Sequence, residues 1–276
     1  PVFEFAPLSR TFVLPFLLIA LNQFFKGRVP LAFLIAGLMY NLHVVSVNFI
    51  LAMFGLACLL EFQRIGLKNI LLGAALFIIS ALPVLLWKAG GDPVDFSLRP
   101  EWVAFLNKTL FFHIFAMLSP TYPGTWVVTF GGLSVIALFF IAVSPATPRA
   151  SGNFHPQPAA TARIFIYAGC LVVLANVITT NWLPVTIIIQ SQIARIGLWM
   201  LILAYLFFAN YLVTLHEQQA LSSQAFFLLA GTFIFSPSPI LVLAAWLLVR
   251  FVRNQVVIRL ATALAPVIIL GSYGVV

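Results

Sequence analysis

Residues 69–86, NILLGAALFIISALPVLL, form an apolar run without a single charged side chain. A hydrocarbon core about 30 Å thick is crossed by about 20 apolar residues in a helix, so this run is close to the length of a membrane span. Inside lipid, every backbone N–H and C=O group needs a partner within the protein, and a helix provides these partners within one segment. The run therefore predicts a transmembrane helix.

Similar apolar runs recur on both sides of this segment. The chain is 63% hydrophobic and 7% charged, with a mean hydropathy of +1.12, whereas an ordinary soluble domain is about 25% charged. We therefore predict an all-α fold, a polytopic transmembrane helical bundle of about ten spans in a single domain over residues 1–276. The expected apolar segments are 11–25, 29–40, 44–60, 69–86, 126–143, 164–180, 196–215, 225–235, 240–248 and 256–276.

Two pairs of these segments are short and are separated by turn residues. One pair turns near Asn41–His43 and the other at Ser236–Pro239, which predicts two short helical hairpins. A further helix is expected over Pro100–Leu118, because Pro100 suits the first position of a helix and Glu101 suits its positive end. Its mixture of charged and apolar residues predicts an outer interfacial helix rather than a span.

The net charge of +8 does not indicate nucleic-acid binding, because the fourteen Lys and Arg residues are scattered singly at the ends of apolar runs. This distribution is the positive-inside pattern of cytoplasmic loops. It places the loop 89–125, which carries three of the six acidic residues, on the outer face. It places the Pro- and Ala-rich segment 144–163 inside, as a flexible cytoplasmic linker. Integral membrane localisation follows, with the bacterial cytoplasmic membrane as the expected site.

The outer loop holds the residues best suited to chemistry in water. Asp92, Asp95 and Glu101, together with His113, are candidates for a substrate-binding site at the membrane surface. Paired acids can bind a divalent cation or act as general bases. The alternative is an anchoring helix whose charges extend to the headgroups. The two cysteines lie inside predicted spans without metal-ligand spacing and indicate no metal site.

Three further candidates lie elsewhere in the sequence. Arg195 opens a span at its outer end, where the positive-inside pattern disfavours a basic residue, and Gln192 lies one turn before it. An arginine fork matches a phosphate group, so Arg195 is a candidate for a phosphate-bearing ligand. A lipid headgroup or an acid of the loop is the alternative partner. His43, at the turn of the first hairpin, is expected either to face the same outer space or to have a structural role.

Several of these features together resemble the bacterial GT-C integral membrane glycosyltransferases. They are the Lys26-Gly27-Arg28 turn, the short hairpin with Gly37 and Asn41-Leu42-His43, the outer loop with His113, and Gln192-x-x-Arg195. The resemblance implies a polyprenyl-phosphate-linked sugar as donor and a site at the outer face, often with a divalent metal. It also implies that Arg195 holds the carrier phosphate while His113 and the loop acids line the acceptor side.

The chain departs from the family in one respect. The family's catalytic acid lies in a large outer loop after the first span, and only Glu4 precedes the first apolar run here. We therefore expect a fragment of a longer chain or a non-catalytic relative, which leaves enzymatic activity open. A transporter or flippase is the alternative, because short hairpins and prolines in spans (Pro83, Pro266) suit discontinuous helices. A membrane scaffold without a ligand is the third hypothesis.

Overall fold

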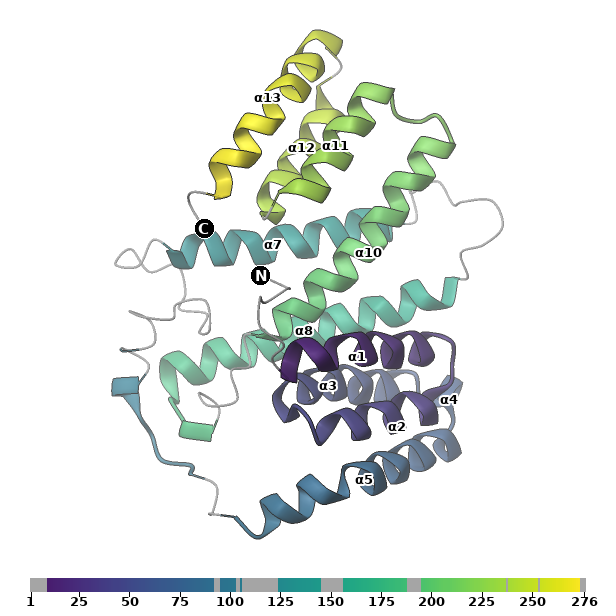
Figure 1. Cartoon of the computed structure of the whole chain (residues 1–276), viewed down its shortest axis with the longest axis vertical. Helices are drawn as coiled ribbons and strands as arrows, with labels where there is room; N and C mark the ends of the chain where they lie inside the picture. The colour runs from purple at the N-terminus through teal and green to yellow at the C-terminus, as the bar shows by residue number, and fades with distance from the viewer. Residues whose placement is uncertain are drawn as a thin grey trace. The chain divides into compact units, whose positions relative to one another are not determined.

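The computed structural model describes residues 9–91, 95–102, 105, 124–144, 156–187, 195–236, 238–252 and 254–273. Within these ranges the chain is helical apart from connecting loops and an isolated antiparallel bridge between Leu98 and Val185 (Figure 1). The prediction of an all-α membrane fold is confirmed. The chain forms two compact units, which are residues 1–116 with 155–199, and residues 117–154 with 200–276.

Four of the described helices are long and apolar enough to cross a membrane. They are α5 (Leu67–Ala89), α8 (Pro156–Trp182), α10 (Ile196–Glu217) and α13 (Gln255–Tyr273). The other helices are α1 (Ser9–Phe25), α2 (Val29–Tyr40), α3 (Val44–Leu60), α4 (Phe62–Ile65), α7 (Gly124–Ala142), α11 (Ser223–Phe235) and α12 (Pro239–Phe251). The chain is thus an integral membrane protein, and its full number of spans stays a prediction.

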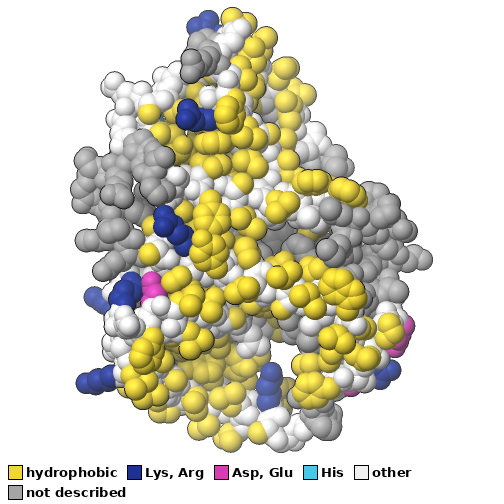
Figure 2. All heavy atoms as spheres, turned by 180° about the vertical axis from the view of Figure 1, so that it is seen from behind, with side chains coloured by type: hydrophobic (Ala, Val, Ile, Leu, Met, Phe, Trp, Pro, Cys, Tyr) yellow, Lys and Arg dark blue, Asp and Glu magenta, His cyan; other side chains and the backbone are white. Residues whose placement is uncertain are grey.

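The exposed side chains of α5 agree with a lipid environment. Only Gly73 and Ala81 are buried on this helix, whereas Leu71, Ile79 and Leu86 are 60%, 68% and 63% exposed. Figure 2 shows hydrophobic side chains over much of the visible surface, with Lys and Arg only at isolated points. A soluble protein does not leave so large an apolar surface in water.

In the first unit, α2 lies beside α1, α3 and α5, and α3 packs in turn on α8 (Figure 1). Three fully buried rings join α1, α3 and α8. The ring centroids of Phe24 and Phe54 lie 4.4 Å apart, and Phe165 lies 5.4 Å from Phe24 and 5.9 Å from Phe54. Aromatic contacts of this kind bury large apolar areas in fixed geometry, and they form the core of this unit.

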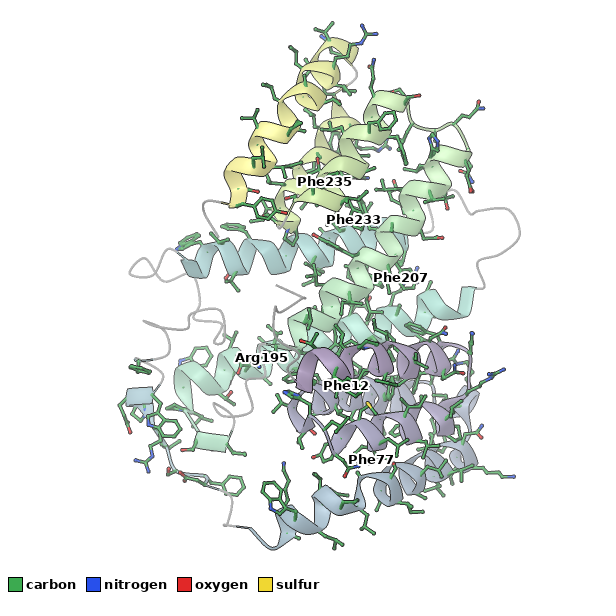
Figure 3. All side chains as sticks on the ribbon, viewed as in Figure 1. Phe12, Phe77, Arg195, Phe207, Phe233 and Phe235 are labelled. Atoms are coloured by element: carbon green, nitrogen blue, oxygen red, sulfur yellow. The ribbon has the colours of Figure 1, made fainter. Side chains whose placement is uncertain are left out.

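One close helix contact of the first unit is between α2 and α5. A Cβ atom at Gly37 would overlap Ser80 Oγ and would lie 2.7 Å from the backbone oxygen of Phe77. Phe77, labelled in Figure 3, also makes an edge contact with the Tyr40 ring at 5.4 Å. Small residues allow two helix backbones to approach in a membrane, where dispersion forces replace the hydrophobic effect between helices.

Asn41, the C-cap of α2, bonds to α5 next to Pro83. Its Nδ2 donates to the Ser80 carbonyl oxygen at 2.7 Å, and its Oδ1 accepts from the Val84 N–H at 3.3 Å. Ser80 O and Val84 N are the i and i+4 partners of a regular helix, and a proline ring pushes against the turn before it. Asn41 therefore satisfies backbone groups of α5 at the turn that Pro83 disturbs.

The continuity of the two proline-bearing helices corrects one expectation. α5 runs through Pro83 and α13 runs through Pro266 without a break. The prediction of discontinuous helices at these prolines is therefore wrong, and in α5 Asn41 bonds to backbone groups of the turn around Pro83. The two predicted hairpins are confirmed as α2–α3 and α11–α12. The expected interfacial helix lies mostly outside the described residues, which show helical geometry at Pro100–Trp102.

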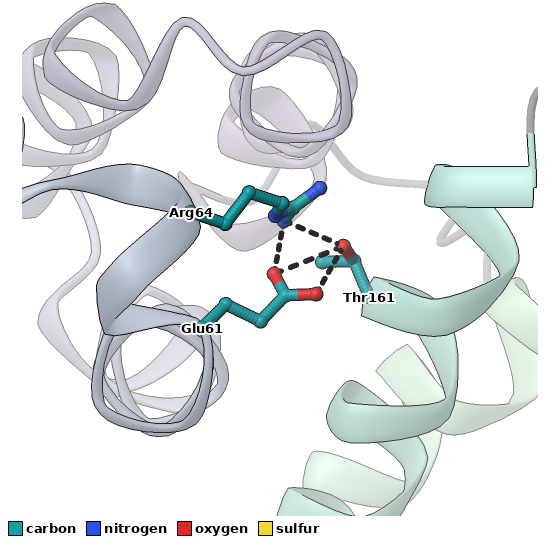
Figure 4. Close-up of polar contacts among 3 residues, drawn as sticks. All are labelled: Glu61, Arg64 and Thr161. Atoms are coloured by element: carbon teal, nitrogen blue, oxygen red, sulfur yellow. Dashed lines mark hydrogen bonds and ion pairs between the residues drawn. The ribbon is translucent and has the colours of Figure 1, made fainter.

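A polar cluster links the end of α3 to α8. Arg64 Nη2 pairs with Glu61 and donates to Thr161 Oγ1 at 2.9 Å, and Thr161 Oγ1 lies 3.1 Å from each carboxylate oxygen of Glu61 (Figure 4). Thr161 is 1% exposed. Because α8 already begins at Pro156, the last part of the predicted linker 144–163 is an ordered helix, and the linker prediction is wrong there.

Replacing Thr161 by valine is expected to lower the free energy of unfolding by about 1–2 kcal/mol, because the substitution removes hydrogen bonds to two charged groups in a nearly buried place. Reversible unfolding in detergent measures this loss. Thr179→Val is the matched control on the same helix, because its hydroxyl bonds only to carbonyl groups of the preceding turn, Ala175 O and Asn176 O. Equal losses in the two variants would contradict a stabilising role of the Glu61–Arg64–Thr161 cluster.

The second unit has its own core between α7, α10, α11 and α12. Its fully buried members include Leu138, Phe208, Leu229 and Val242. α13 packs on α11 and runs parallel to it, because contacts join the two helices at both ends. Arg259 Nε donates to Gln224 Oε1 at 3.2 Å near their starts, and Tyr273 OH donates to Phe235 O at 2.8 Å near their ends.

Candidate functional site

Two loops of the first unit, far apart in sequence, pair with each other through their backbones. The Arg99 N–H donates to Pro184 O at 2.8 Å, and the Thr186 N–H donates to Ser97 O at 2.9 Å. These bonds flank the Leu98–Val185 bridge. Residues 95–101 of the predicted outer loop are thereby held against the segment that follows α8. We call the resulting group of side chains, Asp95, Ser97, Arg99, Glu101 and Thr186, the loop cluster.

Hydrogen bonds order the side chains of the loop cluster. Asp95 Oδ1 accepts from the Ser97 N–H at 2.8 Å, the local turn for which aspartate is suited. Ser97 Oγ accepts from Arg99 Nε at 3.1 Å and lies 3.1 Å from Thr186 Oγ1. Thr186 is fully buried and donates its hydroxyl to Ser97 O at 2.9 Å. The buried Thr186 therefore holds Ser97 in place, and Ser97 in turn bonds to the exposed Asp95 and Arg99.

The charged groups of the cluster lie at its exposed surface. Arg99 Nη1 is 3.8 Å from Glu101 Oε1, and both side chains are open to solvent. Hydrogen bonds from the side chain and backbone of Ser97 lower the pKa of Asp95, and the nearby Arg99 charge and Thr186 hydroxyl lower it further. Asp95 is therefore ionised at neutral pH. A carboxylate held in this way accepts hydrogen bonds well, but it is too weak a base to remove protons near pH 7.

The pKa of Asp95 is expected to lie below its ordinary value of 3.8 and to rise toward that value in Ser97→Ala, because the Ser97 hydroxyl is lost. A lowered pKa stabilises the folded loop above the unfolded pKa, and this contribution is lost as pH falls through the folded pKa. A carboxyl-carbon NMR titration of the protein in detergent measures the shift. Phe96→Ala is the control, since this exposed side chain makes no hydrogen bond to Asp95. A titration of Asp95 that is the same in the wild type and Ser97→Ala would contradict the assignment.

The structure does not place all of the predicted site residues. Asp92, His113 and Gln192 lie outside the described residues. Among the residues that are described, no three His, Cys, Asp or Glu side chains gather into a metal-binding group. Asp95 and Glu101 are the acids of the loop cluster, and Arg99 lies close to both.

Arg195 lies directly before the first residue of α10 (Figure 3). Its side chain is half-buried and already interacts with another group of the chain. The first turn of a helix carries a partial positive charge and free N–H groups, which add to the guanidinium charge in attracting an anion. The predicted phosphate contact of Arg195 stays a prediction.

His43 has a defined structural role. Its Nδ1 accepts a hydrogen bond from the Ser46 N–H at 3.1 Å, which caps the start of α3. A ring nitrogen that accepts a hydrogen bond carries no proton, so the cap uses the form of the ring whose proton is on Nε2. The predicted contact between His43 and a substrate stays a prediction.

The sequence reasoning missed Ser97, Arg99 and Thr186 as members of the site. The D-x-S spacing of Asp95 and Ser97 is a local turn signal that could have indicated the first of these contacts. The partner segment carries no such signal, because its pairing is set by the packing of the whole unit.

No protein family, curated protein or solved structure matches this chain. The resemblance to glycosyltransferases therefore rests on the residue pattern, and the function is argued from the site.

Proposed function

We propose that the protein binds a polyprenyl-phosphate-linked sugar at the outer face of the membrane, in a glycosyltransferase-like role. The observation that carries the proposal is the pairing of residues 95–101 with residues 184–186, which brings two carboxylates, a guanidinium and two hydroxyls into one group joined by hydrogen bonds and an ion pair. Sugar hydroxyls are both donors and acceptors, and this group offers partners of both kinds.

The surroundings of the loop cluster suit a ligand that is part lipid and part sugar. Phe96, within the first paired segment, and Trp182, two residues before the second, are 70% and 66% exposed. Tryptophan rings, which combine an apolar body with a polar N–H, are common at membrane interfaces. They also offer apolar surface to the carbon face of a sugar ring. The apolar faces of α5 and α8 are open to the lipid carrier.

The proposal assigns separate tasks to two arginines. Arg99 and the ionised Asp95 hold the sugar, and Arg195 at the start of α10 holds the carrier phosphate. The lowered pKa of Asp95 makes it a binding group rather than the proton acceptor of a transfer reaction. The described part of the site therefore supports recognition of the lipid-linked sugar.

Binding of two probes to the full chain in nanodiscs tests the proposal. The probes are a polyprenyl phosphate and the same carrier with one sugar attached to its phosphate. We expect Arg195→Ala to weaken both about tenfold, as for the loss of a charge-assisted phosphate contact. Arg99→Ala is expected to weaken only the sugar-bearing probe.

Arg28→Ala is the matched control, because Arg28 is an exposed arginine of the Lys26-Gly27-Arg28 turn and lies on the face predicted to be cytoplasmic. Thermal melting of each variant shows whether it is folded, and Arg195→Lys retains the charge if the alanine variant is unstable. Unchanged affinity in Arg195→Ala would overturn its phosphate role. Equal affinity of the wild type for both probes would overturn the sugar site.

A further inference from the structure

The second unit contains a cavity of about 460 Å³ that the proposed function does not use. It lies where α7, α10 and α12 end and α11 begins. Its inner surface includes the fully buried Leu229, and Tyr211 and Trp246 form half-buried walls. Ala220 and Arg250 are exposed members of the lining. The volume is in the range of small-molecule sites, about 300–1,000 Å³.

Arg250 gives this cavity its charge. Among the described residues it has neither a hydrogen-bond nor an ion-pair partner. The neighbouring Arg259, by contrast, is held by Gln224. Three helices direct their partially negative C-terminal ends toward the cavity, so an anion would be repelled there without the guanidinium. Arg250 is thus the group on which any anion binding would depend.

The chemistry of the lining indicates the class of ligand. A buried aliphatic floor suits hydrocarbon, and tyrosine and tryptophan suit the boundary between hydrocarbon and headgroup. A guanidinium at the exposed edge suits a phosphate. Basic pockets between transmembrane helices on the cytoplasmic side recognise anionic headgroups in this way.

We propose that this cavity binds an anionic phospholipid, with its phosphate on Arg250 and its first acyl carbons against the half-buried Leu221 and Val249. By the distribution of Lys and Arg, this end of the unit faces the cytoplasm, so the site is distinct from the loop cluster and does not depend on the proposed function. The lipid acts there as a structural ligand that fills the space between the ends of four helices.

Lipid retention tests this site. The full chain is reconstituted in phosphatidylcholine nanodiscs that also contain phosphatidylglycerol, extracted into detergent, and analysed by native mass spectrometry for bound lipid. We expect the wild type to retain phosphatidylglycerol in preference to phosphatidylcholine. In Arg250→Gln this preference is expected to fall about tenfold or more.

Two variants distinguish lipid binding in the cavity from a general effect of surface charge on lipid retention. Arg259→Gln makes the same charge change at the same end outside the cavity, and its preference is expected to equal that of the wild type. Ala220→Trp fills the cavity edge without a charge change, and it is expected to lose retention as Arg250→Gln does. If Arg250→Gln fails to fold, as judged by thermal melting, Ala220→Trp tests the proposal in its place.

Equal losses in Arg250→Gln and Arg259→Gln would overturn the proposal, as would full retention in Ala220→Trp. Displacement of the retained lipid by inorganic phosphate alone would also overturn it, because the site would then recognise a free anion rather than a phospholipid.

Discussion

Gly37→Ala is expected to destabilise the protein by about 2–3 kcal/mol, the cost of overpacking a close contact. The added methyl group would overlap Ser80 Oγ and lie 2.7 Å from Phe77 O. The serine hydroxyl can rotate away, but the backbone oxygen cannot, so α2 and α5 must separate along their whole contact. Reversible unfolding in detergent measures the loss.

Gly55→Ala is the matched control for this substitution. Gly55 lies within α3, and a Cβ atom there would meet no other atom within 4 Å. The change is therefore expected to be neutral or to stabilise the helix by up to about 1 kcal/mol, the difference in helix propensity. Ser80→Ala in the Gly37→Ala background should recover only part of the stability. Equal behaviour of the two glycine variants would contradict the close approach of α2 and α5.

Asn41→Ala is expected to cost about 1–3 kcal/mol, because Ser80 O and Val84 N lose a partner in apolar surroundings. The same loss should speed hydrogen exchange at the Val84 amide, which now donates to Asn41 Oδ1. Unfolding measurements and amide exchange on the protein in detergent give the two readouts.

The dependence of this effect on Pro83 gives a sharper test. Pro83→Ala restores the missing N–H and removes the ring that disturbs the preceding turn. Asn41→Ala should therefore cost less in the Pro83→Ala background, and a double-mutant cycle should give a coupling energy of about 1 kcal/mol. Strictly additive losses would show that Asn41 does not compensate for the proline.

The helices could be predicted from the sequence because lipid imposes a strong local rule. A run of apolar residues of sufficient length must satisfy its own backbone, so most helix ends lie within three residues of their predicted positions, as for α5. α8 is the exception. Its start at Pro156 was missed because the segment before Arg163 is not apolar, and Thr161 is buried there through its bonds to Glu61 and Arg64.

The site was less accessible to prediction because it depends on contacts between distant segments. Asp95 and Glu101 could be named from their chemistry, but Thr186, which bonds to Ser97 between them, lies about ninety residues later in a segment with no signal of its own. Asn41 looked like an ordinary turn residue for the same reason. Its acceptor and donor are on α5, and periodicity along one segment carries no information on which helix packs beside it.

The hairpin of α11 and α12 has a consequence for how the chain enters the membrane. Each helix has 13 residues, a length of about 20 Å against a hydrocarbon core of about 30 Å. The turn between them bonds to itself through Ser236 and Ser238. No charged residue occurs from Ser223 to Val249. The pair can therefore partition into lipid as one unit from the side on which it is synthesised, without carrying a charge across. Because it begins and ends on that side, removing it entirely would leave the orientation of α13 unchanged.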